Sequence, residues 1–189
     1  MSELNKNETN KDIPMRRRLL KGGLGASPLL MTLISRPVLG DGFRCVSPSG
    51  YTSMPSSRQP ETHKCDGGTP GFWKQEQHFK AWPAGYYPKT KNGNQATTFA
   101  PFFSYSPYTP ETTFLQVLET MGGPPDSVAR HIVAAVLNAE KGWTTVMTVA
   151  AIKNIWNSYR TLGYFEPTAG VRWYHDQIQN YLESTMQHD

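Results

Sequence analysis

The chain has 189 residues and a formal net charge of +4, from 19 Lys and Arg against 15 Asp and Glu. Residues 1–40 hold seven of the basic and three of the acidic side chains, so the rest of the chain carries 12 of each. A balanced charge gives no net attraction for a polyanion, and we expect no nucleic-acid partner. The length fits one domain, and a hydrophobic fraction of 38% supports a packed core.

Residues 1–40 are predicted to be an export signal with a disordered start. An Arg pair stands before two apolar residues and a Lys, and this run resembles the twin-arginine export signal. The residues of the motif are Arg16, Arg17, Leu19, Leu20 and Lys21. A moderately apolar, glycine-containing stretch follows, and small residues ending at Gly40 predict cleavage after that position.

The resemblance implies that the protein is periplasmic or extracellular, and that one partner is the twin-arginine export machinery. The alternatives are an uncleaved membrane anchor and an ordinary basic tail. No apolar run reaches the roughly 20 residues that a spanning helix needs, so we expect no stable membrane span after cleavage.

A Ser- and Pro-rich segment, residues 41–66, contains the only two cysteines of the sequence, Cys45 and Cys65. In an oxidising compartment this pair predicts a disulfide. Closing a loop of about 20 residues would stabilise the fold by roughly 3 kcal/mol. Two alternatives are a metal pair completed by His63 and His78, and free thiols.

Residues 41–110 are predicted to be irregular, because turn residues are dense and no apolar period persists. We expect one or two helical turns within residues 73–79 and an exposed loop at residues 89–98. The many aromatic side chains have two interpretations, a small core or a stacking platform for sugar rings or another flat ligand. The platform residues would be Trp73, Trp82, Tyr86 and Tyr87, and a cell-envelope glycan would then be a possible partner.

Four short amphipathic helices are predicted at residues 111–121, 127–140, 149–162 and 171–185. The expected caps and stops are Thr109, Asp126, Gly142, Thr148 and Gly163. The apolar faces of the first and last helices comprise Phe114, Val117, Leu118 and Met121, and Tyr174, Ile178, Tyr181 and Leu182. The predicted fold is mainly α, a small bundle of about four short helices. The aromatic-rich, irregular N-terminal half wraps against it, and residues 67–189 form one domain.

No established catalytic motif occurs in the sequence: the glycine-rich run at residues 67–71 lacks the spacing of a phosphate-binding loop. We therefore assign no catalytic residue and no cofactor, and favour a non-enzymatic role. Among the histidines, we expect His63 and His188 to be solvated and His175 to lie on the surface. His131 lies beside an apolar stripe and is expected to be a packed or capping side chain.

The run from Gly68 to Lys74 (GTPGFWK), followed by His78, Trp82 and a Gly-Tyr pair, resembles a module in an uncharacterised family of exported bacterial proteins. Residues 129–139 (ARHIVAAVLNA) resemble its helical companion. The resemblance covers roughly residues 65–186 and implies one exported domain, without naming a reaction. The candidate binding residues that it groups are Trp73, Lys74, His78, Trp82, Tyr86, Arg130 and His131.

The resemblance also implies a structural role for Arg130, His131 and Asn138, which would tie the aromatic half to the second helix by hydrogen bonds. The leading functional hypothesis is an exported, non-enzymatic binding or structural module. One alternative is an accessory subunit of an exported redox enzyme complex. Another is a small metal-dependent enzyme that uses His78 with Glu76 or Asp66.

Overall fold

The computed structural model describes residues 45–53 and 65–188, with all of their side chains except that of His188. The predicted export signal, its cleavage site after Gly40, and His63 lie outside the described residues.

Helices make up most of the regular structure, which confirms the mainly α class. The helices are α1 (Pro48–Ser53), α2 (Pro70–Lys74), the 3-10 helix η2 (Glu76–Ala81), α3 (Phe114–Glu119), α4 (Asp126–Lys141), α5 (Val149–Leu162) and α6 (His175–Glu183). The strands are β1 (Gly67–Gly68), β2 (Phe165–Thr168), β3 (Val171–Trp173) and β4 (Met186–His188), paired as parallel β1–β4 and antiparallel β2–β3. The described residues thus form seven helical segments, more than the four predicted, and none of these is long and apolar enough to cross a bilayer.

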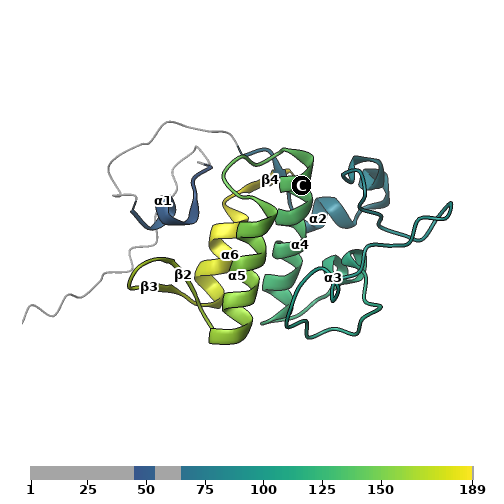
Figure 1. Ribbon diagram of the computed structural model, residues 1–189. Helices are drawn as coiled ribbons and strands as arrows, with labels where there is room; N and C mark the ends of the chain where they lie inside the picture. Colours follow the sequence, from purple (N-terminus) through teal and green to yellow (C-terminus); the bar gives the residue numbers. More distant parts are fainter. Residues whose placement is uncertain (1–44, 54–64, 189) are drawn as a thin grey trace, which may run out of the picture. The chain divides into compact units, whose positions relative to one another are not determined.

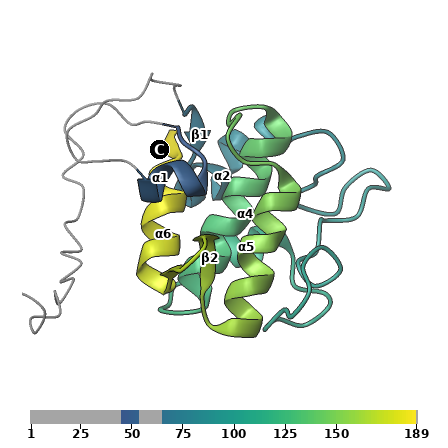
Figure 2. The same cartoon turned by 60° about the vertical axis from the view of Figure 1, so that its left-hand side comes forward.

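Helix α4 is the element against which most others pack: it contacts α2, α3, α5 and α6 (Figure 1, Figure 2). Every residue from Ser127 to Asn138 is buried except Arg130. The predicted apolar face is confirmed, but burial continues around the whole helix, as expected for a helix covered on all sides. Arg130 is therefore the position in this stretch where a polar side chain reaches the surface.

Helix α5 has the bounds that the sequence predicts. The side chain of Thr148 accepts a hydrogen bond from the backbone N–H of Ala151, which stabilises the first turn. Gly163 ends the helix with φ of 79°, a left-handed conformation that glycine adopts without steric cost. The side chains of Ile155 and Trp156 are buried as predicted.

Helix α3 is shorter than the predicted range 111–121. Thr113 and Gln116 form a reciprocal capping box, so the helix begins at Phe114 rather than after the expected cap Thr109. The backbone turns extended after Glu119. Met121 consequently lies beyond the helix and is 88% exposed, which corrects its predicted burial.

The predicted helix at residues 171–185 is wrong in its first turn. Residues 171–173 form β3, which pairs with β2 across a turn that contains Gly170 at φ of 80°. An aromatic and a β-branched residue beside a glycine turn favour this hairpin over a helix. Tyr174 is therefore the cap residue of α6 and is 54% exposed, whereas Ile178, Tyr181 and Leu182 are buried as predicted.

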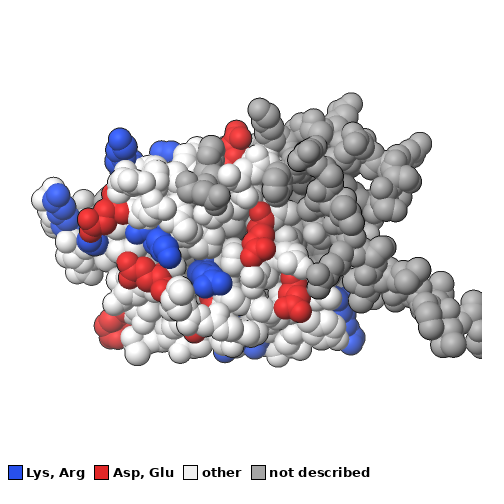
Figure 3. Space-filling model, turned by 180° about the vertical axis from the view of Figure 1, so that it is seen from behind, with Lys and Arg blue, Asp and Glu red and all other residues white. Residues whose placement is uncertain are grey.

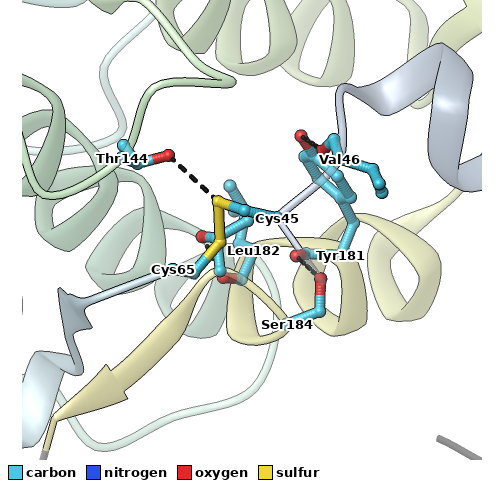
Figure 4. Close-up of a disulfide and its surroundings, with 8 residues drawn as sticks. Cys45, Val46, Cys65, Thr144, Tyr181, Leu182 and Ser184 are labelled. Atoms are coloured by element: carbon cyan, nitrogen blue, oxygen red, sulfur yellow. Dashed lines mark hydrogen bonds between the residues drawn. A yellow bond between two sulfur atoms is a disulfide. The ribbon is translucent and has the colours of Figure 1, made fainter. Parts of the chain in front are cut away.

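Cys45 and Cys65 form the predicted disulfide, with their Cα atoms 5.1 Å apart (Figure 4). Both residues are buried, and the Sγ of Cys45 lies 3.6 Å from the hydroxyl of Thr144. Beside them, the hydroxyl of Tyr181 donates to the carbonyl of Val46 at 3.0 Å. The disulfide thus holds the α1 segment next to α6, and it fits an oxidising compartment.

Asn138 of α4 connects the helices to the aromatic-rich half. Its Oδ1 accepts hydrogen bonds from the backbone N–H of Gly68 at 2.8 Å and from the indole Nε1 of Trp73 at 2.9 Å. Its Nδ2 donates to the carbonyl of Gly68 at 3.0 Å. A Cβ at Gly67 would lie 2.6 Å from the carbonyl oxygen of Thr185, so β1 needs glycine to approach β4.

The aromatic side chains of the irregular half form part of the core. Phe99 lies edge-on to Trp156 of α5, with ring centroids 5.2 Å apart, and Phe103 packs against the same indole. The indole Nε1 donates to the carbonyl of Ser104 at 3.0 Å. Buried aromatic rings therefore supply the apolar area that this half lacks in aliphatic residues.

Candidate functional site

A pocket of about 230 Å³ lies where α2, the end of α3, α4 and α6 meet. It collects side chains from segments more than one hundred residues apart in the sequence, from Pro70 to Glu183. Its polar side chains include Lys74, Arg130, His131 and Glu183, and its apolar wall includes Pro70, Leu118 and Met121. The exposed lining is more polar than apolar, and its charged groups converge from α2, α4 and α6.

Lys74 reaches the pocket from the last residue of α2. The side chain of Thr69 caps this short helix by accepting the N–H of Phe72 at 3.1 Å, and Pro70 occupies the first turn, where it costs no hydrogen bond. Trp73 anchors α2 in the core. The adjacent Lys74 is exposed and directed to the pocket.

Arg130 fixes the opposite wall. Its Nη1 donates to the carbonyl of Thr120 at 3.2 Å, so the guanidinium holds the chain where it leaves α3. A guanidinium carries five N–H donors in a planar fork, and this bond uses only one of them. The remaining donors give Arg130 the capacity to bind a ligand oxygen.

His131 is the buried polar group of the pocket: its side chain is 8% exposed. The Nδ1 atom must carry a proton, because it lies 2.6 Å from the carbonyl oxygen of Ser127, which can only accept. The Nε2 atom lies 3.2 Å from Glu183 Oε1. Burial lowers the pKa of His131, and this effect outweighs the opposing influence of the Ser127 carbonyl and the Glu183 carboxylate.

The charges in the pocket are unbalanced. Lys74 and Arg130 have no ion-pair partner among residues 45–53 and 65–188, while Glu183 faces His131. Leaving His131 aside, the formal charges of Lys74, Arg130 and Glu183 sum to one positive charge. On the face of the molecule seen in Figure 3, charges of both signs are interspersed, with no large area of a single sign there.

A second polar network links the N-termini of α4 and α6. The Oγ of Ser127 lies 2.6 Å from Nε2 of His175, and Nδ1 of His175 lies 2.8 Å from Asp176 Oδ1. The distances match a serine nucleophile activated by histidine, but the burial does not. Ser127 is only 4% exposed, and the Asp176 side chain is 88% exposed to screening water. We interpret the network as a structural link; the His175 side chain is part-buried, with 23% of its surface exposed.

The structure brings three of the seven candidate residues together, since Lys74, Arg130 and His131 all line the pocket. Trp73 and Trp82 belong to the core instead. The remaining two, His78 and Tyr86, are part-buried and do not line the pocket. The candidate residues therefore divide between a site and the core that supports it.

His78 has other partners than a metal-binding group. Its ring stacks on Phe72 with centroids 3.9 Å apart, and its Nε2 lies 3.2 Å from Nε2 of Gln77. Glu76 pairs with Lys89. Across the part of the chain that the structure describes, no three His, Cys, Asp or Glu side chains gather in an arrangement that could hold a metal ion.

Of the three residues expected to tie the aromatic half to α4, Asn138 forms such bonds directly. Arg130 bonds to the residue that follows α3, and His131 bonds to its own helix and to α6. Tyr86 lies near enough to Glu140 of α4 for that carboxylate to act on its hydroxyl. Burial, with the added effect of that carboxylate, raises the pKa of Tyr86 to about 12.

Sequence analysis did not find Glu183, which completes the polar part of the pocket. The residue looks like an ordinary solvated helix position, because its neighbours in the sequence contain no motif. Only its approach to His131, 52 positions earlier, gives it a role.

Comparison with models of protein families, with curated protein sequences and with solved structures gave no match.

We expect the stability of the protein to fall as the pH decreases below about 6.5, the usual pKa of histidine. Because folding lowers the pKa of His131, the unfolded chain binds the proton more readily, and stability is lost as the pH falls through the folded-state value. Thermal unfolding at pH 7.5 and 5.5 measures the effect. In His131→Asn the amide nitrogen takes the place of Nδ1 and can still donate to Ser127, but it does not titrate, so the loss of stability should be smaller. An equal loss of stability between the two pH values would contradict this assignment.

Proposed function

We propose that the protein is an exported, non-enzymatic binding module of the periplasm or cell surface, and that the pocket lined by Lys74, Arg130, His131 and Glu183 is its ligand site. One observation carries the proposal. Two cationic side chains from different elements line one small pocket, and neither has an ion-pair partner among the described residues. A bound anion would relieve their repulsion, so the ligand carries a negative group.

Three sequence features support the exported location. The run at residues 16–21 resembles a twin-arginine export signal, and the GTPGFWK module resembles that of other exported bacterial proteins. The buried Cys45–Cys65 disulfide is compatible with an oxidising compartment. In this proposal, α3, α4, α5 and α6 act as a four-helix scaffold that holds the pocket residues in place.

The experiment is to express the full chain in a bacterium with the twin-arginine pathway, purify it from the periplasm and record native mass spectra. We expect the wild-type protein to carry a small anionic ligand that Lys74→Gln/Arg130→Gln lacks. The control Lys80→Gln/Arg160→Gln removes the same two charge types outside the pocket, from an exposed lysine and from an arginine that also donates to a backbone carbonyl. It should keep the ligand.

Three results would overturn the proposal. Protein that stays in the cytoplasm as precursor contradicts export. An equal amount of ligand on Lys74→Gln/Arg130→Gln contradicts the pocket. A stoichiometric protein partner in place of a small molecule contradicts the binding module and supports the accessory-subunit alternative.

A further inference from the structure

We infer that the pocket binds a monocarboxylate that bears a short apolar group, either a free aliphatic acid or the C-terminal residue of a peptide. This inference rests on the proposed function and specifies the chemistry of its ligand. It depends on four features of the site: the cations, the single carboxylate, the exposed methionine and the volume.

The cationic side chains of Arg130 and Lys74 favour a ligand with negatively charged oxygen atoms. The free N–H donors of Arg130 have the fork geometry that matches the two oxygens of a carboxylate. Its bond to Thr120 restrains the guanidinium before any ligand arrives, which lowers the entropy lost on binding. Lys74, on the facing helix α2, adds a second charge on a flexible stem.

Glu183 selects against a doubly charged ligand. Its carboxylate lines the same pocket as Lys74 and Arg130, so the formal charges of these three side chains sum to +1. One net positive charge matches a monoanion, whereas phosphate or a phosphonate would place its second charge against Glu183. A ligand N–H or hydroxyl group could instead donate to the Glu183 oxygens.

Met121 supplies the apolar contact. Met121 lines the pocket and is yet 88% exposed, among the most exposed large hydrophobic side chains of the described residues. It is followed by Gly122 and Gly123, which place few steric limits on its backbone. A flexible thioether side chain adapts to aliphatic groups of different shape. An aliphatic ligand would remove this surface from water.

The volume sets the size of the ligand. At about 230 Å³ the pocket is smaller than the sites that enclose drug-sized molecules. It has room for a carboxylate and one short aliphatic chain. A free acid and the last residue of a peptide offer the same group, so they are tested in parallel.

The test is calorimetric titration of the exported full-length product with hexanoate, hexanamide and hexylphosphonate at pH 9, where hexylphosphonate is doubly charged. We expect hexanoate to bind at least about tenfold more tightly than the amide, since a charge-assisted hydrogen bond is lost in the amide. Lys74→Gln and Arg130→Gln should each weaken the binding of hexanoate by a similar factor. Lys80→Gln and Arg160→Gln should not, and thermal unfolding of each variant shows that it is folded.

Two further variants test selectivity. Glu183→Gln should improve binding of hexylphosphonate more than that of hexanoate, because Glu183 repels a dianion more strongly than a monoanion. Met121→Ser should weaken the binding of hexanoate but leave the binding of acetate unchanged. A peptide ending in leucine, compared with its C-terminal amide, distinguishes the two sources. Tighter binding of the acid peptide than of hexanoate assigns the site to peptide C-termini, and the reverse assigns it to free acids.

The two proposals fail in different ways. Equal binding of hexanoate and hexanamide overturns the monocarboxylate inference alone. So does a protein that binds neither probe but carries a native ligand that Lys74→Gln/Arg130→Gln lacks. Tighter binding of hexylphosphonate than of hexanoate to the wild-type protein also overturns it. If no native ligand is found and none of the probes binds, both proposals are wrong.

Discussion

Asn138→Ala is expected to lower the free energy of unfolding by about 3 kcal/mol or more. The substitution leaves three buried groups without their partner: the N–H and the carbonyl of Gly68, and the indole N–H of Trp73. Each such group costs about 1–3 kcal/mol when it stays unsatisfied in the folded protein. Chemical denaturation, followed by tryptophan fluorescence, measures the change. Because Trp73 reports on the same contact, its environment in the folded variant should also change.

Asn157→Ala is the matched control. The Asn157 Oδ1 atom is buried without a hydrogen-bond partner, so removing it deletes an uncompensated polar group from helix α5. Alanine is also the better helix former. We expect stability that is unchanged or slightly higher. A loss as large as that of Asn138→Ala would show that truncation of an asparagine, and not the broken network, is responsible.

Removal of the disulfide is the second large effect. Cys45→Ser/Cys65→Ser is expected to lose roughly 3 kcal/mol, since the bond closes a loop between residues 20 positions apart. The double substitution avoids a lone reactive thiol. Oxidised wild-type protein, reduced wild-type protein and the variant are compared by thermal unfolding. Reduction should bring the wild-type protein to the stability of the variant.

The disulfide also has a local readout. The disulfide holds the α1 segment beside α6. Its loss should therefore expose the hydrogen bond from the Tyr181 hydroxyl to the Val46 carbonyl to water. Hydrogen exchange in residues 45–53 should then increase more than exchange in α4. Equal stability of the oxidised and reduced wild-type proteins would contradict the expected role of the bond.

The helices differ in how well local sequence predicts them, and their caps explain the difference. Helix α5 has a side-chain cap at Thr148 and a glycine stop at Gly163, so both of its ends are determined by adjacent residues. In α6, the apolar period continues backward through Tyr174 into a strand. The pairing of β3 with β2 ends the helical pattern there, and periodicity within one segment does not reveal it.

The candidate site shows the same division. Lys74, Arg130 and His131 were grouped in the sequence by a resemblance alone, and the structure gathers them in one pocket. Met121 was expected to be buried, because its spacing from Leu118 continues a helical face. The capping box and the early end of α3 leave it at the pocket, where its exposure becomes the argument for an apolar ligand.

The sequence alone determined the features that depend on neighbouring residues or on a unique pair: the mainly α class, the bounds of α5, the buried face of α4 and the partner of Cys45. The distribution of charge also separated the basic residues 1–40 from an electrically balanced remainder. The tertiary structure decided the role of Asn138, the approach of Glu183 to His131, and the pocket itself. These depend on contacts between residues distant in the chain, which only packing of the helices around α4 brings within reach of one another.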